Sequence, residues 1–284
     1  MLTRRRFAAL SAATAAALAV PLKLQAAATR SGLEFGVQLY TLRNQITDLA
    51  ADLELVHQIG YTSVEVFPAI YNHPPKELKA MIESHGLKAP SGHFDYATIG
   101  DKVDYAAGLG LQYMICPAIP RPQWDTLDGF HKAAEYLNKA SAKIGAAGMK
   151  LGYHAHNYEY KPIEGSTGFE VLMKELDPAV RLELDIYWAT EAGQNVVELM
   201  RKHRDRLELM HLKDRKPATA FSFVPGPNGA HFTEAGSGTI DFKAVLGEAR
   251  KLGVKYMFVE QDVTDIPVDQ SLRVSWKFLS QLSI

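Results

Sequence analysis

The feature of this sequence that most constrains its fold is a repeated alternation of short apolar segments with longer helical ones. Each short segment precedes a stretch of helical periodicity. Eight strands are predicted, at residues 33–39, 63–67, 88–94, 113–116, 151–156, 181–186, 206–212 and 256–260. The helices that follow them are predicted at residues 47–58, 75–85, 101–109, 122–147, 167–176, 196–203, 242–252 and 268–282.

Eight strand–helix pairs over about 250 residues are the number and size expected of a (β/α)8 barrel. The alternative α/β architecture, a doubly wound open sheet, would place a glycine-rich phosphate turn after the first strand. The sequence there is Tyr40-Thr41-Leu42, which is not such a turn. We therefore predict one α/β domain, a TIM barrel over residues 29–284, whose functional face lies at the carboxyl ends of its strands.

The first 28 residues differ in character from the rest of the chain. Arg4, Arg5 and Arg6 precede an apolar, alanine-rich run at residues 8–20, and small residues follow at 26–28. This order is typical of a cleaved twin-arginine export signal, and the apolar run is too short to span a bilayer comfortably. An uncleaved amphipathic anchor is the alternative. We expect a periplasmic protein that is free of the membrane once the signal is removed.

The charge of the chain bears on nucleic-acid binding, and its cysteine content bears on how the fold is stabilised. The full chain has 31 Lys and Arg against 32 Asp and Glu, and the predicted signal holds four of the cations, which leaves 27 basic residues against 32 acidic ones. A mildly acidic surface argues against binding of nucleic acid, which depends on basic patches. Cys116 is the single cysteine, so no disulfide can form within the chain and the apolar core must supply the stability.

The segment LGYHAHNYEY, at residues 151–160, places polar chemistry at the end of the fifth predicted strand. His154 and His156 are two residues apart, so on a strand both imidazoles point to the same face. Such a pair suits metal binding or proton transfer, although a hydrogen-bonded structural pair is an alternative. Asn157 and Glu159 follow directly. We expect Asn157 to contact the substrate and Glu159 to act as an acid or base.

Other predicted strands end in the same way. The polar or ionisable side chains at their carboxyl ends are Gln38, Tyr40, Glu65, His93, Asp95, Cys116, Asp185, His211, Lys213 and Glu260. Because the carboxyl ends of barrel strands meet at one rim, we expect these groups to lie together. Substrate contacts are predicted for Gln38, Tyr40 and His93, and for Trp188 beyond the sixth strand.

A metal shell is predicted from four of these strand ends: His154, Asp185, His211 and Glu260. Two imidazoles and two carboxylates suit one divalent cation such as Mn²⁺, Zn²⁺, Co²⁺ or Fe²⁺, and suit Ca²⁺ poorly. The alternative for each residue alone is a buried polar group satisfied by its neighbours. Lys213 would share the face of His211, where it could neutralise an enolate or alkoxide oxygen. A salt bridge from Lys213 to Asp185 or Glu183 is the alternative.

The connection at residues 214–240 is long, and in a barrel it lies on the functional face. Its aromatic, proline-containing part at 221–227 is a candidate lid. Gly236 and Gly238 could hold a phosphate at the start of the next helix, but a plain turn is the simpler interpretation. Four aromatic residues could form apolar walls for a sugar, or could close the top of the core: Trp188, Phe94, Tyr40 and Phe223.

Together these motifs resemble the sugar phosphate isomerase/epimerase family, the xylose-isomerase-like barrels, over essentially the whole chain after residue 28. The resemblance is carried by VQLYTLR at 37–43, VEVF at 64–67, SGHF at 91–94, YHAHNYEY at 153–160, LELDIYW at 182–188, HLKD at 211–214, GSGTIDF at 236–242 and FVEQD at 258–262. It implies that Asp185, His211 and Glu260 stand where epimerases of the family hold their metal. His154 stands where those enzymes carry a glutamate.

The departure at His154 bears on the expected reaction. The family's epimerases use two metal-bound carboxylates on opposite faces of the sugar to remove and return a proton. With an imidazole at one of these places, the second base would have to be His156, Glu159 or Glu65. Glu260 or a spare histidine would move the proton.

The expected function is an isomerase-type enzyme that removes a proton next to a sugar carbonyl through a metal-stabilised enediolate, giving isomerisation or epimerisation. Predicted export disfavours a phosphorylated metabolite, which leaves a free sugar, a keto-sugar or a glycoside as the small-molecule substrate. The alternatives are a lyase that acts by β-elimination on a 3-keto-sugar derivative, endonuclease-like hydrolysis of a phosphodiester, and an inactive sugar-binding barrel. A homo-oligomer is compatible with each of them.

Overall fold

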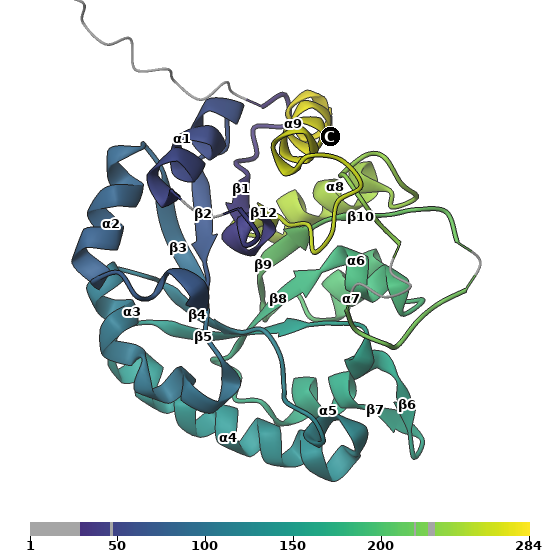
Figure 1. Cartoon of the computed structure of the whole chain (residues 1–284). Helices are drawn as coiled ribbons and strands as arrows, with labels where there is room; N and C mark the ends of the chain where they lie inside the picture. Colours follow the sequence, from purple (N-terminus) through teal and green to yellow (C-terminus); the bar gives the residue numbers. More distant parts are fainter. Residues whose placement is uncertain (1–28, 46–47, 219, 227–230) are drawn as a thin grey trace, which may run out of the picture.

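The computed structural model describes residues 29–45, 48–218, 220–226 and 231–284, so the predicted export signal lies outside the described residues. Eight parallel strands form a closed barrel, which confirms the predicted TIM barrel (Figure 1). Around the barrel the order is β1, β2, β3, β4, β5, β8, β9 and β12, and β12 pairs back with β1. The strands are β1 (Gly36–Gln38), β2 (Ser63–Val66), β3 (Lys88–His93), β4 (Tyr113–Cys116), β5 (Lys150–Ala155), β8 (Arg181–Asp185), β9 (Leu207–Leu212) and β12 (Tyr256–Val259).

Helices surround the strands (Figure 1). They are α1 (Leu49–Ile59), α2 (Pro75–Ser84), α3 (Val103–Leu109), α4 (Leu127–Ala146), α5 (Gly168–Glu175), α6 (Ile186–Glu191), α7 (Val196–Lys202), α8 (Phe242–Leu252) and α9 (Val268–Gln281). Side-chain caps mark several of their starts, as at Thr167 and Asp241, whose oxygens accept backbone N–H groups of the first turn. Within the described part of the chain, no helix combines the length and the apolar character that crossing a membrane requires.

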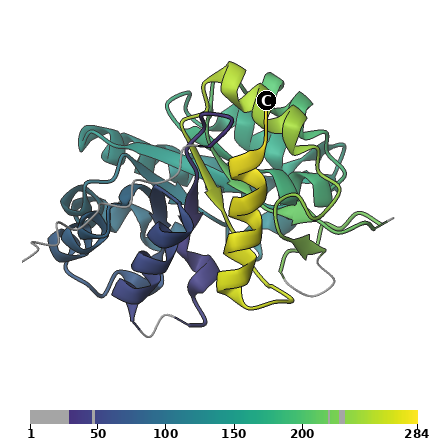
Figure 2. The same ribbon diagram turned by 90° about the horizontal axis from the view of Figure 1, so that it is seen from above.

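The two ends of the described chain lie side by side and reinforce the closure of the barrel (Figure 2). β1 and β12 pair over two residues each. Outside the sheet, the Arg30 N–H donates to the Ser280 carbonyl at 2.8 Å. The Tyr61 hydroxyl, at the start of β2, donates to the Leu272 carbonyl of α9 at 2.9 Å. Helix α9 therefore adds hydrogen bonds near the junction between β1 and β12, where the two strands pair over only two residues each.

At two places, local hydrogen bonds set the boundary of a helix or strand at a different residue from the predicted one. The helix predicted at 122–147 is interrupted at Thr126, whose extended backbone separates a 3-10 turn (Gln123–Asp125) from α4. Its hydroxyl accepts the Gly129 N–H at 3.1 Å and caps α4. The first strand is shorter than predicted at both ends, and it ends at Gln38 because the chain enters a 3-10 turn (Leu39–Leu42) capped by the side chain of Gln38.

Helix α6 was not predicted, and the side chain of Asp185 explains why it forms. This residue ends β8, and its Oδ1 accepts the Trp188 N–H at 2.9 Å, which starts a helix in a sequence of strand-like composition. Two short hairpins were also not predicted: β6 (Pro162–Ile163) with β7 (Ser166–Thr167), and β10 (Asp214–Arg215) with β11 (Phe232–Thr233).

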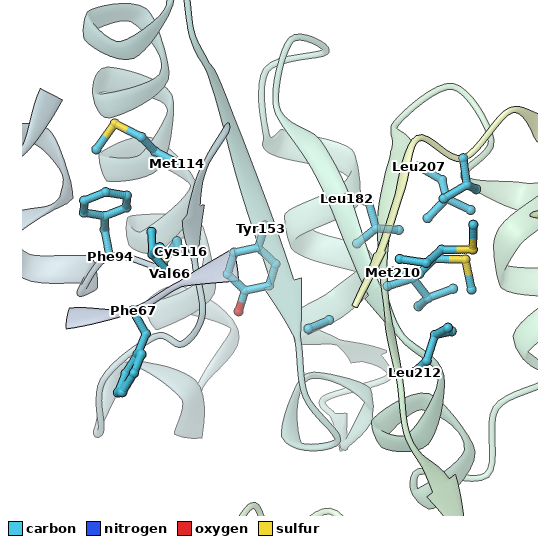
Figure 3. Close-up of a cluster of buried hydrophobic side chains, with 14 of the residues drawn as sticks. Val66, Phe67, Phe94, Met114, Cys116, Tyr153, Leu182, Leu207, Met210 and Leu212 are labelled. Atoms are coloured by element: carbon cyan, nitrogen blue, oxygen red, sulfur yellow. The ribbon is translucent and has the colours of Figure 1, made fainter. Parts of the chain in front are cut away.

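Alternation along the strands separates two apolar regions. Outward-facing side chains such as Val66, Leu182 and Met210 belong to the large core between strands and helices, part of which Figure 3 shows. Inward-facing side chains form a second, smaller cluster, consisting of Tyr113, Ile115, Leu209 and Phe258. Full burial of one large apolar side chain contributes about 1.5–3 kcal/mol. This inner cluster fills the lumen beneath the polar strand ends.

Candidate active site

Polar side chains from most of the strands converge in the lumen at its carboxyl-terminal end. Strand pairing sets Glu183 beside His154 and Asp185 beside His211. Positions two apart on a strand share a face, so Glu183 and Asp185 both point inward, as do His211 and Lys213. The converging group, all of it buried, comprises Glu65, His93, His154, Glu183, Asp185, His211, Lys213 and Glu260.

The predicted metal shell forms the part of this group nearest the strand ends, and we call it the outer set: His154, Asp185, His211 and Glu260. Each residue offers one ligand atom, and all four atoms lie within 4.8 Å of one another. His211 Nδ1 lies 2.9 Å from Glu260 Oε2. Asp185 Oδ2 lies 3.8 Å from His154 Nε2 and 4.0 Å from His211 Nδ1.

A second layer lies one step deeper along the strands, and we call its carboxylates the inner glutamates, Glu65 and Glu183. Glu183 Oε2 lies 3.0 Å from His154 Nδ1 and 3.3 Å from His211 Nε2. Glu65 Oε2 lies 2.7 Å from His211 Nε2. His93 Nε2 stands between the two glutamates, 3.1 Å from an oxygen of each. His93 was predicted to contact substrate; its ring nitrogen lies in this layer, and the substrate contact stays a prediction.

Lys213 flanks the outer set and is fully buried. Its Nζ lies 3.0 Å from Asp185 Oδ2, 2.8 Å from Asp262 Oδ2 and in direct contact with Glu260. Burial alone would lower the pKa of Lys213, but these three carboxylates raise it well above its usual value. Lys213 is therefore an ammonium at neutral pH, and of the two salt-bridge partners considered, Asp185 is the one in contact.

The residues fit a divalent cation by charge and by unmet bonding capacity. Five carboxylates, from Glu65, Glu183, Asp185, Glu260 and Asp262, face one permanent cation, Lys213. Burial raises the pKa of Asp185 to about 6 and that of Glu183 to about 7, and a bound cation would stabilise the ionised form of each. Oε1 of Glu65 and Oε1 of Glu183 have no hydrogen-bond partner, and Oδ2 of Asp185 has none apart from its ion pair with Lys213. A ligand set of imidazole and carboxylate suits Mn²⁺, Zn²⁺, Co²⁺ or Fe²⁺.

Three other predicted site residues form hydrogen bonds within the protein, although Oδ1 of Asn157 has no partner. Gln38 donates to Glu65 Oε2 at 2.8 Å and accepts the Tyr40 N–H at 3.0 Å. Asn157, predicted to bind substrate, donates both amide hydrogens to carbonyls of the long loop, at residues 222 and 224. Glu159, predicted to be catalytic, accepts the Tyr153 hydroxyl at 2.6 Å and the His156 N–H at 2.9 Å. These contacts help to shape the site, and the roles of the three residues toward a substrate stay predictions.

His156 remains available for chemistry. Its ring lies 4.8 Å from that of His154 and 5.2 Å from that of Trp188, and its Nδ1 has no hydrogen-bond partner. Burial lowers its pKa to about 3, so the imidazole is neutral.

Among the four aromatic residues considered as walls, Trp188 and Phe94 are core residues at 1% exposure, while Tyr40 is 37% exposed. Lys213 Nζ lies 5.6 Å from the centre of the Trp188 ring.

The long loop after β9 is held by charged groups that the sequence did not single out. Arg215 Nε donates to Glu191 of α6 at 2.6 Å, and both residues are buried. The carboxylate of Asp214 accepts four backbone N–H groups, from Arg215, Gly236, Gly238 and Ile240, at 2.8–3.1 Å. The glycine-rich turn therefore binds an internal carboxylate, as a plain turn. Part of the predicted lid, at 227, lies outside the described residues.

A pocket opens beside the site on the carboxyl-terminal face. It has a volume of about 350 Å³ and lies between the loops that follow β1 and β12, lined among others by Arg43, Gln261 and Asp262. Asp262 thus connects this pocket to Lys213, and the sequence-based prediction missed it. Its position two residues after Glu260, and that of Glu183 two residues before Asp185, was the available signal.

Fold and site together define a (β/α)8 barrel of the enzyme type, with acid–base and metal-ligating groups at the carboxyl ends of its strands. The chain belongs to the xylose isomerase-like TIM barrel family, whose model matches residues 53–281.

Individual relatives share this fold. Inosose dehydratase of Geobacillus kaustophilus is 24% identical over 232 residues, 67% of this chain and 72% of that protein. Matches to several other inosose dehydratases span about half of those proteins. A structure titled sugar phosphate isomerase/epimerase, from Parabacteroides distasonis, is 25% identical with a TM-score of 0.74 and covers 86% of this chain and 96% of its own. The IOLI protein with a bound zinc atom has a TM-score of 0.70 at 16% identity, covering 86% and 96%.

Proposed function

We propose that this protein is a metal-dependent enzyme that removes a proton from the carbon next to a sugar carbonyl. The observation that carries the proposal is the outer set, with the ammonium of Lys213 3.0 Å from Asp185. His154, Asp185, His211 and Glu260 would hold the cation. When bound, it would polarise the oxygens of the substrate and so acidify the neighbouring C–H.

The protein's own residues supply the remaining steps. Lys213 is a fixed positive charge that can stabilise an oxyanion as it develops. Glu260, at the rim, is a carboxylate that can accept the proton, and neutral His156 is a second base. Trp188 and Phe232 flank Lys213 and exclude water from it, which strengthens its electrostatic effect.

Isomerisation, epimerisation and dehydration all begin with this proton removal. Dehydration is a specific second candidate, because this chain resembles relatives named inosose dehydratase. The matches cover 67% of this chain for one of them and 51% for another. His154 supports it as well: with imidazole in place of a carboxylate, the outer set offers fewer anionic bases for returning a proton to the opposite face of the sugar.

The proposed substrate carries no phosphate. In many TIM barrels, loops after the seventh and eighth strands and a nearby helix start bind phosphate through backbone N–H groups. Here the N–H groups of Gly236, Gly238 and Ile240 are taken by Asp214. A free sugar, a keto-sugar or a glycoside is therefore favoured. We also propose that the enzyme works in the periplasm after export of the folded chain, on the sequence of residues 1–28.

The test is incubation of metal-loaded protein with free and 3-keto sugars in D₂O, followed by NMR. Carbon-bound deuterium without loss of water indicates isomerisation or epimerisation, and an unsaturated product indicates dehydration. Activity should require Asp185 and survive in Glu208→Gln, because Glu208 lies at the opposite end of the barrel with Lys150 and Lys255. Sugar binding without exchange or product would identify an inactive barrel and overturn the proposal.

A further inference from the structure

The two histidines of the outer set each reach both layers of the site. His154 places Nε2 toward Asp185 at 3.8 Å and Nδ1 toward Glu183 at 3.0 Å. His211 places Nδ1 toward Glu260 at 2.9 Å and Nε2 toward Glu65 at 2.7 Å. Each ring is thus held between one carboxylate of the outer set and one inner glutamate, and the two rings do so with opposite nitrogens.

A neutral imidazole has one N–H, and a carboxylate beside one ring nitrogen retains the proton there. The other nitrogen then has a lone pair for a metal, and hydrogen bonding of the distal N–H fixes the ring and increases its basicity. We propose that the inner glutamates are positioning residues for the metal: Glu183 keeps the proton of His154 on Nδ1, and Glu65 keeps that of His211 on Nε2. His154 therefore binds the cation through Nε2, and His211 through Nδ1. This inference rests on the proposed function in taking the outer set as the metal site.

The surroundings of the inner glutamates support this role. Gln38 donates to the same Glu65 oxygen that faces His211, and its own carbonyl oxygen is fixed by the Tyr40 N–H. Glu65 is therefore oriented before any metal binds. Glu183 is fully buried and stands on β8, two residues from Asp185. The same strand thus sets one carboxylate on the metal side of the histidines and another on the far side.

A competing arrangement would place the cation deeper, among His93, His154, Glu183 and His211, whose ligand atoms also lie within 4.8 Å of one another. It would use the opposite nitrogens of both shared histidines. Two observations favour the outer set. Lys213 and the pocket lie on its side. The inner nitrogen of His154 already faces a carboxylate at hydrogen-bond distance, 3.0 Å from Glu183, whereas its outer nitrogen lies 3.8 Å from Asp185. Both nitrogens of His211 face a carboxylate, with Glu65 nearer at 2.7 Å than Glu260 at 2.9 Å.

The decisive experiment identifies the ligand nitrogens. Full-length protein with ¹⁵N-labelled histidine is loaded with Zn²⁺ or ¹¹³Cd²⁺, and long-range ¹H–¹⁵N spectra are recorded, with assignment by single His→Gln variants. We expect metal at Nε2 of His154 and Nδ1 of His211, with slowly exchanging protons on the other nitrogens. Metal at Nδ1 of His154 and Nε2 of His211 would overturn the proposal in favour of the deeper site, whatever reaction the enzyme catalyses.

Variants measure the contribution of each glutamate. Glu183→Gln and Glu65→Gln should each weaken Zn²⁺ binding about 10- to 100-fold in competition with a chelator, as loss of such hydrogen-bond partners does. Glu208→Gln, which removes a partly buried carboxylate far from the site, should leave the Zn²⁺ affinity unchanged. Unchanged affinity in both inner variants would overturn the proposal. If a variant fails to fold, the spectra of the wild-type protein still decide. Failure to bind Zn²⁺ at all would overturn the proposed function as well.

Discussion

The Nζ of Lys213 lies 3.0 Å from Oδ2 of Asp185, the same oxygen that faces both histidines of the outer set. One carboxylate oxygen is thus shared between a fixed ammonium and the proposed position of a cation. The arrangement places two positive charges on one side of the substrate space, where an oxyanion would form.

Asp185 has two functions that substitutions can separate. Its Oδ1 caps α6, and its Oδ2 faces the outer set. Asp185→Asn should keep the cap and lose most bound metal. Asp185→Ala should lose the metal and, even without metal, about 1 kcal/mol of stability, because the cap is lost as well. Metal content and thermal melting with and without EDTA measure both effects, since a ligand of the folded state raises Tm. Wild-type metal affinity in Asp185→Asn would contradict the assignment.

Removal of the ammonium should separate binding from turnover. Lys213→Ala should retain metal, because no ligand is lost and a competing cation is removed, but it should lose turnover. Without metal it should be destabilised by about 3–5 kcal/mol, since three buried or partly buried carboxylates lose their partner. Chelator competition, kcat and urea denaturation measure the three effects. Loss of metal together with activity would show that Lys213 serves the metal site itself.

Glu159 should make stability depend on pH. Burial raises its pKa from 4.5 to about 7. The folded protein then holds a proton that the unfolded chain has released, so this contribution is complete below pH 4.5 and is lost as the pH rises toward 7. Glu159→Gln can still accept the His156 N–H and can donate to the Tyr153 hydroxyl oxygen. Urea denaturation of metal-free protein at several pH values should show the variant gaining relative to wild type between pH 5 and 7. A constant difference would refute the raised pKa.

His154 and Glu183 should be energetically coupled. In His154→Glu the new carboxylate would face Glu183, whose oxygen lies 3.0 Å from Nδ1 of the native ring. Like charges at that distance oppose ionisation, so the single variant should bind Zn²⁺ more weakly than His154→Glu combined with Glu183→Gln. The double variant also offers a second carboxylate opposite Glu260, and epimerase activity should be sought there. Additive effects on Zn²⁺ affinity would show that the two positions do not interact.

Export is tested separately from chemistry. A fusion of residues 1–35 to a reporter that functions only after export in the folded state should reach the periplasm. Replacement of both Arg4 and Arg5 by lysine should stop it, because the twin-arginine route reads the guanidinium pair. Equal export of the two fusions would rule out a twin-arginine signal.

The sequence allowed the barrel and the positions of the polar strand ends to be predicted, because both follow from periodicity. A residue two before or after a known inward residue also points inward, which is how His211 and Lys213 were placed together. Periodicity does not show how deep in the barrel each inward-facing side chain lies. Glu183 and Asp185 share a face, but their different partners, an imidazole proton for one and a helix N–H for the other, depend on neighbouring strands.

Three predicted site residues have partners that the sequence did not indicate. Gln38 and Asn157 were predicted to contact substrate, and Glu159 to act as an acid or base, because they are polar and stand at strand ends. In the structure, their polar atoms form hydrogen bonds with neighbouring side chains and backbone groups of the protein. Buried polar groups need such partners. Asp214 was missed as the anchor of the loop because its partners, Gly236 to Ile240, are more than twenty residues away in the sequence.

The outer set is distributed over β5, β8, β9 and the residue after β12, which limits when a cation could bind during folding. Residues 154 and 260 are separated by more than a third of the chain, so no early fragment emerging during synthesis contains all four proposed ligands. A metal would therefore not nucleate this fold as it nucleates a zinc finger. The last proposed ligand, Glu260, is synthesised just before α9, so a cation would bind late, after the barrel has assembled.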